Sequence, residues 1–152
     1  MFELIQSISI DAARGVASGK ASVPAAHPLF ADHFPDAPLL PGSLLIELAA
    51  QIAGPLAEQV LKARLDVERW SLLGMIRSAK FLRPVSLPAA IALGAEVRRF
   101  EQSSITVAVE AHESEQVVMR GELVMMMFEA KPEWDAAIRA RHQRLASWKG
   151  VA

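Results

Sequence analysis

The sequence predicts an α+β fold in which an antiparallel sheet wraps around one long central apolar helix. Three observations lead to this prediction. Residues 42–62 have helical character and are too apolar to face water. Two short alternating runs precede them, and four longer β runs follow. No helical segment of similar length interrupts those later strands, so the sheet must cover this helix.

The first part of the chain reads as two strands and a stiff loop. Residues 2–10 and 14–24 contain short alternations of apolar and polar side chains, which are typical of strands joined by a turn at 12–15. Residues 25–41 are rich in Pro, His and Asp. Each proline fixes φ and removes a backbone donor, so we expect an ordered and rigid loop.

The central helix is expected to begin at Gly42, because Pro41 is a suitable residue at a helix start. Apolar residues cover every face of its first half, which predicts burial on all sides. Pro55 lacks the N–H that would bond to Gln51, so it should kink or redirect the helix. Charged residues predict that the far end reaches water: Glu58, Lys62 and Arg64.

The second half of the chain reads as four strands and a helical tail. The β runs are 72–85, 90–100, 104–113 and 116–128. The last run ends in residues that are apolar on both faces, as in a strand covered on both sides. Residues 132–148 have helical composition. We therefore predict one main domain over residues 1–130 and a helical tail over 131–152.

The bulk composition excludes several classes of function. The net charge is −1 and 22% of residues are charged, which gives no electrostatic case for nucleic-acid binding. The chain has no cysteine, which rules out disulfides, a thiol nucleophile and cysteine-based metal sites. Its four histidines lack metal-ligand spacing, and there is no glycine-rich phosphate loop. We expect neither a metal nor a cofactor.

Hydropathy and the chain start bear on location and assembly. The residues before 10 lack a basic segment followed by a long apolar run, so no targeting signal is predicted. Polar residues and prolines interrupt the apolar stretch 39–61, which argues against a membrane span. We expect a soluble cytoplasmic protein. The mean hydropathy of +0.25 is high for a monomer and suggests buried subunit contacts.

The stretch from His33 to Glu47 contains the candidate catalytic residues. Imidazole exchanges protons near neutral pH, and His33 lies in the stiff loop. Glu47 is a lone carboxyl in the apolar helix, where desolvation favours the protonated form. Together they predict a general base and a general acid. The alternatives are a structural loop histidine and a carboxyl that serves only packing. Gly42 places a backbone N–H at the positive end of the helix dipole.

The same stretch resembles the signature of a known family. The run His33-Phe34-Pro35, with Pro38, Pro41-Gly42, Glu47 and Ala50-Gln51, is similar to that of the hotdog-fold FabZ/FabA family of 3-hydroxyacyl-[acyl-carrier-protein] dehydratases. Residues 74–85 resemble the strand that follows the helix in that family, and the similarity covers residues 1–129. Glu47 in place of Asp indicates the FabZ branch. The departures are Asp36 where the family usually has Gly, Pro55 inside the helix, and the lack of tyrosine.

The resemblance assigns roles to these residues. It implies that His33 is the base, that Glu47 is the acid and that the amide of Gly42 polarises the thioester carbonyl. Four residues are candidates for substrate binding: Phe34, Pro41, Gln51 and Phe81. Gln51 either orients Glu47 or forms a hydrogen bond at a subunit interface. Phe34 and Phe81 line an acyl tunnel or belong to the core.

The resemblance also implies an assembly. Two subunits pair their sheets into one continuous sheet, and each site takes the histidine from one chain and the acid from its partner. A hexamer of three such homodimers is an alternative assembly.

The implied reaction is the reversible, cofactor-free dehydration of 3-hydroxyacyl thioesters on acyl carrier protein to trans-2-enoyl thioesters. It would serve fatty-acid synthesis or a related polyketide or aryl-polyene pathway. The rival functions are a hotdog acyl thioesterase and a non-catalytic acyl-binding or partner subunit of a heteromer. For the acidic carrier there are two candidate docking surfaces. One is the basic tail at 136–152 and the other is Arg77, Lys80 and Arg83.

Overall fold

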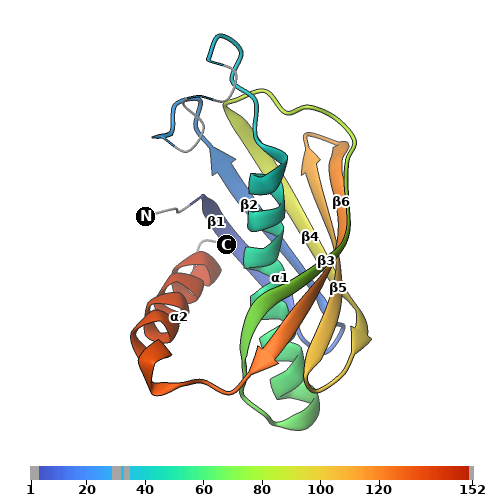
Figure 1. The fold of residues 1–152 in the computed structure, drawn as a ribbon, viewed down its shortest axis with the longest axis vertical. Helices are drawn as coiled ribbons and strands as arrows, with labels where there is room; N and C mark the ends of the chain where they lie inside the picture. Colours follow the sequence, from blue (N-terminus) through green and yellow to red (C-terminus); the bar gives the residue numbers. More distant parts are fainter. Residues whose placement is uncertain (1–3, 29–31, 33–34, 151–152) are drawn as a thin grey trace.

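The computed structural model describes residues 4–28, 32 and 35–150. Within these residues, a six-stranded antiparallel sheet wraps around one long helix, α1 (Gly42–Leu65), as Figure 1 shows. The strand order is β1-β2-β4-β5-β6-β3. The strands are β1 (Ile5–Asp11), β2 (Val16–Val23), β3 (Trp70–Phe81), β4 (Ala89–Phe100), β5 (Ser104–Glu113) and β6 (Gln116–Phe128). The predicted α+β arrangement of a sheet around an apolar helix is confirmed.

The predicted order of elements is also confirmed, and the boundary that differs most is the end of β3. The run predicted as 72–85 becomes β3, which ends at Phe81. The last bond of this edge is donated by the Leu82 N–H to the Val118 carbonyl at 2.9 Å. Pro84 follows and has no N–H to continue the ladder. The chain then turns back toward the loop that precedes α1.

The core forms where α1 lies against the concave side of the sheet. Leu48, Ile52 and Leu56 of the helix are fully buried. Val107 of the sheet is fully buried as well, and Leu123 is 1% exposed. The helix runs through the buried Pro55 and continues to Leu65, three residues beyond the predicted end. It then stops at Asp66 in the left-handed conformation. By length and composition α1 could span a membrane, but it is the buried core helix of a soluble domain.

The prediction that the first half of α1 is buried on all sides is wrong for the single chain. Ser43 and Glu47 are exposed, and Ile46 and Ala50 are half-buried. These positions recur every three or four residues, so they form one stripe along the helix. The sheet of the same chain covers the other faces and leaves this stripe open.

The edge strand β3 also carries uncovered apolar side chains. Leu72, Met75 and Ile76 are 42%, 53% and 45% exposed, and Phe81 is 49% exposed. Its outer edge has no neighbouring strand among the described residues. An apolar edge of this kind is a template for pairing with another chain.

The tail forms a short 3₁₀ turn, η2 (Pro132–Trp134), followed by α2 (Asp135–Gly150). This confirms the predicted helical tail. In Figure 1, α2 lies beside β1, and its Arg141 reaches Glu58 of α1. Leu145 and Trp148 are buried in the core. The division of the chain at residue 130 stays a prediction.

Candidate active site

The loop before α1 is held by backbone hydrogen bonds to the segment after β3. The Leu40 N–H donates to the Val85 carbonyl at 2.8 Å, and the Leu87 N–H donates to the Pro38 carbonyl at 3.0 Å. Pro41 is the N-cap of α1, and the N–H groups of Leu44 and Leu45 donate to its carbonyl. No side chain among the described residues caps this helix start. The first amides of α1 are therefore available to a ligand.

Gly42 lies against the ring of Phe81. A Cβ atom on Gly42 would lie 2.9 Å from Cε1 and 3.0 Å from Cζ of that ring. Both residues line a pocket of about 480 Å³, together with Leu40, Leu45 and Arg83. A side chain at this position would displace the ring, so glycine permits the close approach. The structure thus brings together two predicted site residues, Gly42 and Phe81, around one opening, and Pro41 directly precedes Gly42.

Glu47 and Gln51 form a second group one turn along α1. The Gln51 Nε2 donates to Glu47 Oε1 at 2.9 Å, as residues four apart on a helix can. The role of Gln51 in orienting Glu47 stays a prediction. The expectation of a buried Glu47 is wrong for the single chain, because this side chain is on the open stripe. The Gln51 Oε1 atom is buried without a described partner. A buried acceptor of this kind calls for a donor from outside the described residues.

The two groups do not face the same opening within one chain. Glu47 lies five positions after Gly42, so the two residues project from α1 about 140° apart around the helix axis. The Phe81 pocket lies beside Gly42, whereas Glu47 points along the open stripe. His33 and Phe34 lie outside the described residues. A site to which two chains contribute stays a prediction.

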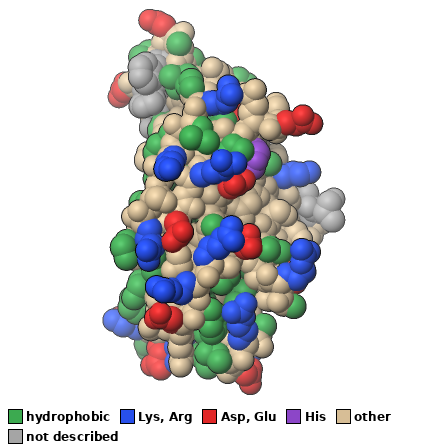
Figure 2. All heavy atoms as spheres, turned by 90° about the vertical axis from the view of Figure 1, so that its right-hand side faces the viewer, with side chains coloured by type: hydrophobic (Ala, Val, Ile, Leu, Met, Phe, Trp, Pro, Cys, Tyr) green, Lys and Arg blue, Asp and Glu red, His purple; other side chains and the backbone are tan. Residues whose placement is uncertain are grey.

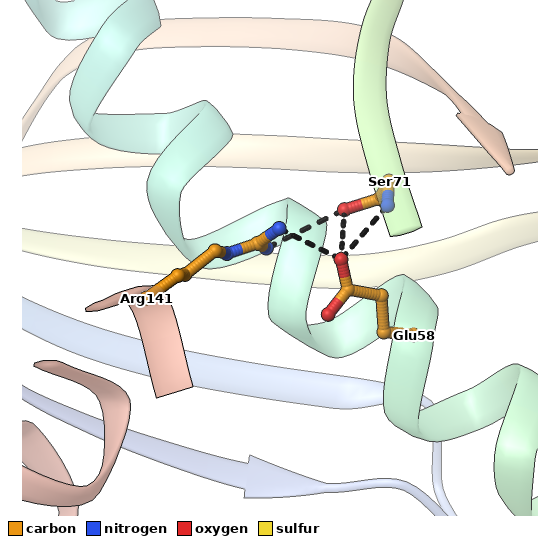
Figure 3. Close-up of polar contacts among 3 residues, drawn as sticks. All are labelled: Glu58, Ser71 and Arg141. Carbon is orange, nitrogen blue, oxygen red and sulfur yellow. Dashed lines mark hydrogen bonds and ion pairs between the residues drawn. The ribbon is translucent and has the colours of Figure 1, made fainter. Parts of the chain in front are cut away.

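Sequence reasoning missed a third polar group, drawn in Figure 3. Glu58 was expected to reach water, but its side chain is only 13% exposed. Its Oε1 accepts bonds from the Ser71 N–H at 2.8 Å, the Ser71 hydroxyl at 2.7 Å and Arg141 Nη1 at 2.7 Å. The guanidinium of Arg141 also lies 4.4 Å from the ring of Trp70. The available signal was the spacing of Glu58, which follows Gln51 by seven residues, or about two turns, on the same side of the helix.

The surface charges are mixed in sign. Figure 2 shows basic and acidic side chains interspersed on the face seen there. On the sheet, Arg77 pairs with Glu122 at 3.2 Å and Arg120 pairs with Glu110 at 3.0 Å. Among the three residues of the proposed basic group, Arg77 is thus partly neutralised. Lys80 and Arg83 are exposed beside the Phe81 pocket.

Comparison with known proteins gives a consistent picture. A family model described as ApeI-like, ApeI dehydratase, matches residues 9–122. The chain is 37% identical over 100 residues to the 3-hydroxyacyl-[acyl-carrier-protein] dehydratase FabZ of Chlamydia trachomatis serovar L2, and this match covers 66% of the chain and 65% of that protein. The FabZ of Chlamydia abortus is 32% identical over 124 residues, which cover 82% of the chain and 80% of that protein.

Solved structures agree on the hotdog fold. A conserved protein of Pseudomonas aeruginosa matches with a TM-score of 0.64 at 17% identity, over 82% of this chain and 88% of that one. A Streptococcus mutans protein bound to acetyl CoA matches with the same TM-score at 13% identity, over 86% and 94% of the two chains. At these identities the likeness shows the fold alone.

Proposed function

From the premise that this chain belongs to the ApeI-like dehydratase family of FabZ-related hotdog proteins, we propose that it dehydrates 3-hydroxyacyl thioesters reversibly. The observation that supports this most is the uncapped start of α1 at Gly42, set against Phe81 in an open pocket. The products are a trans-2-enoyl thioester and water. The substrate is carried on acyl carrier protein, and the enzyme works in the cytoplasm as a homodimer.

The proposed chemistry needs a base, an acid and a polarised carbonyl. The Gly42 N–H binds the thioester oxygen and stabilises the charge that develops there. His33 takes a proton from C2, and the electron pair forms the C2–C3 double bond. The C3–O bond breaks as Glu47 of the partner subunit gives its proton to the leaving hydroxyl. Water leaves the site. The cycle is complete when the carboxyl regains a proton and the imidazole loses the one that it took.

The dimer is proposed to form through β3. Its exposed apolar side chains and open backbone edge suit pairing with β3 of a second copy. Such pairing would also cover the open stripe of α1. Glu47 would then lose contact with water, in the apolar setting that a general acid requires. The orphaned Gln51 Oε1 would also come close to groups of the second chain.

The carrier protein is proposed to dock at Lys80 and Arg83. Both are exposed next to the Phe81 pocket, through which the thioester would enter. The tail is the weaker candidate, because Arg141 is engaged by Glu58 and Arg144 is also engaged. A Lys80→Glu, Arg83→Glu variant should raise KM for a carrier-bound substrate but not for the same acyl group on pantetheine. The matched variant Arg139→Glu, Lys149→Glu should change neither; a rise in carrier KM there would move the docking site to the tail.

One assay tests the proposed activity. The protein is incubated with 3-hydroxyacyl and 2-enoyl thioesters of carrier protein, while hydration and free-thiol release are both followed. Hydration without thiol release supports the dehydratase, and thiol release alone supports the thioesterase. Folded protein that does neither would be a binding subunit. Hydration undiminished in His33→Ala would overturn the assigned base.

A further inference from the structure

Three polar side chains and one glycine lie along one side of α1, which we call the polar stripe; its first member is the proposed acid. Glu47, Gln51, Gly54 and Glu58 are spaced by four, three and four residues. At 100° per residue they fall within a band of about 60° on one side of the helix. Buried apolar residues occupy the opposite side, including Leu45 and Leu56. The stripe thus joins the Glu47–Gln51 pair to the Glu58 cluster in one line.

The far end of this stripe is closed by Arg141 of α2. A Cβ atom on Gly54 would lie 2.7 Å from Arg141 Nη2 and 2.8 Å from Ser71 Oγ. The guanidinium therefore lies directly against the helix at Gly54, and Figure 3 shows its contacts with Glu58 and Ser71. Its ion pair with Glu58 is largely shielded, with 20% and 13% of the two side chains exposed. Displacing it would leave the Glu58 carboxylate without its cation, which is costly for a shielded group.

β3 contacts α1 near both ends of the polar stripe. Phe81 contacts Gly42 at one end, and Ser71 bonds to Glu58 at the other. Between these contacts β3 presents exposed apolar side chains, including Leu73 and Ile76. An acyl chain with its C3 hydroxyl at Glu47 that extends toward Gly54 therefore runs beside these apolar side chains of β3.

On the basis of the proposed function, we propose that Arg141 determines acyl-chain length by closing the distal end of the acyl site. Glu47 and Gly54 are seven residues apart, which is about 10.5 Å along the helix. After about 3.5 Å is allowed for contact with the guanidinium, about 7 Å remains. An extended chain advances about 1.2 Å per bond, so about six bonds fit beyond C3. The favoured substrates are therefore acyl chains of up to about nine carbons.

The helix that carries this closure lies outside the residues matched to the family model. The family model ends at residue 122, and α2 begins at Asp135. Leu145 and Trp148 anchor α2 in the core and so fix the position of Arg141. A relative without such a helix would lack the charged end.

The experiment compares kcat/KM for 2-enoyl pantetheine thioesters of four, eight, twelve and sixteen carbons. The wild-type protein should use the two shorter chains and discriminate against the two longer ones. Arg141→Ala should raise the ratio of long-chain to short-chain kcat/KM on the order of tenfold, as expected for about two newly buried methylene groups. Arg139→Ala, on the exposed side of the same helix, should leave the ratio unchanged. Equal use of all lengths by the wild type, or an unchanged ratio in Arg141→Ala, would overturn the inference.

Two measures keep the test decisive. If Arg141→Ala does not fold, the pair Glu58→Gln, Arg141→Met removes both charges together and retains the side-chain volume. Calorimetric binding of the same thioesters gives the same ratio without turnover. If the protein turns over none of the thioesters and yet binds them with a length dependence that changes in the Arg141 variants, that result would support the inference and refute the proposed activity. A length dependence of binding that is the same in the wild type and the Arg141 variants would refute this inference and leave the proposed activity standing.

Discussion

The contact between Gly42 and Phe81 gives a prediction that separates catalysis from stability. In Gly42→Ala the new Cβ would lie 2.9 Å from Phe81 Cε1. Carbon atoms in contact prefer about 3.5 Å, so the ring must move by about 0.6 Å or more. Phe81 is 49% exposed, which lets the ring move outward at little cost. The movement displaces the wall of the pocket beside the proposed oxyanion donor.

The expected outcome is a stable but impaired protein. Alanine is favoured over glycine inside a helix by about 0.5–1 kcal/mol, which offsets the displacement of the ring. We therefore expect the free energy of unfolding to stay within about 1 kcal/mol of the wild type. A misplacement of this size at a reacting group lowers kcat/KM by about 10- to 100-fold.

The assay is hydration of a 2-enoyl thioester, with urea unfolding of the same samples. Gly94→Ala is the matched control, because a Cβ atom there meets nothing within 4 Å. It should keep full activity. Gly42→Ala with normal stability and at least half of the wild-type kcat/KM would refute the assignment of this helix start as the oxyanion site.

Three further predictions concern the acid, the subunit edge and a helix end. Glu47→Gln keeps the bond partner of Gln51 but removes the proton donor, so kcat should fall about 10²- to 10⁴-fold with little change in melting temperature; undiminished kcat would exclude Glu47 as the acid. Ile76→Lys places a charge on the exposed β3 edge and should halve the mass seen by analytical ultracentrifugation and abolish hydration, whereas Glu115→Lys on the β5–β6 turn should do neither. Asp66 ends α1 with a φ of 53°, a conformation that favours glycine. Asp66→Gly should therefore raise the free energy of unfolding in urea by about 0.5 kcal/mol. A lower free energy of unfolding would mean that the exposed ion pair with Lys62 at 2.8 Å outweighs the backbone strain.

The fold was readable from the sequence because its strongest local patterns agree with its tertiary packing. The alternation of apolar residues in 104–113 predicted β5 with its observed bounds. The apolar character of residues 42–62 predicted a central helix. The end of β3 was missed by four residues, because Pro84 acts on the ladder while the apolar run continues past it.

The site was only partly readable. The spacing of Glu47 and Gln51 predicted their contact, because residues four apart share a helix face. The open stripe was not predicted, because composition alone cannot tell which apolar face the chain covers itself and which it leaves for another chain. The Glu58–Arg141 pair joins residues 83 positions apart, and no local pattern connects them.

Mixing two inactive variants measures most directly whether two chains share each active site. His33→Ala and Glu47→Gln subunits are unfolded together, refolded and assayed for hydration of a 2-enoyl thioester. If each site combines His33 of one subunit with Glu47 of the other, half of the dimers are mixed and each has one intact site. The mixture should then regain about one quarter of the wild-type rate. A mixture in which mass analysis shows mixed dimers, yet activity stays at the level of the separate variants, would contradict the shared site.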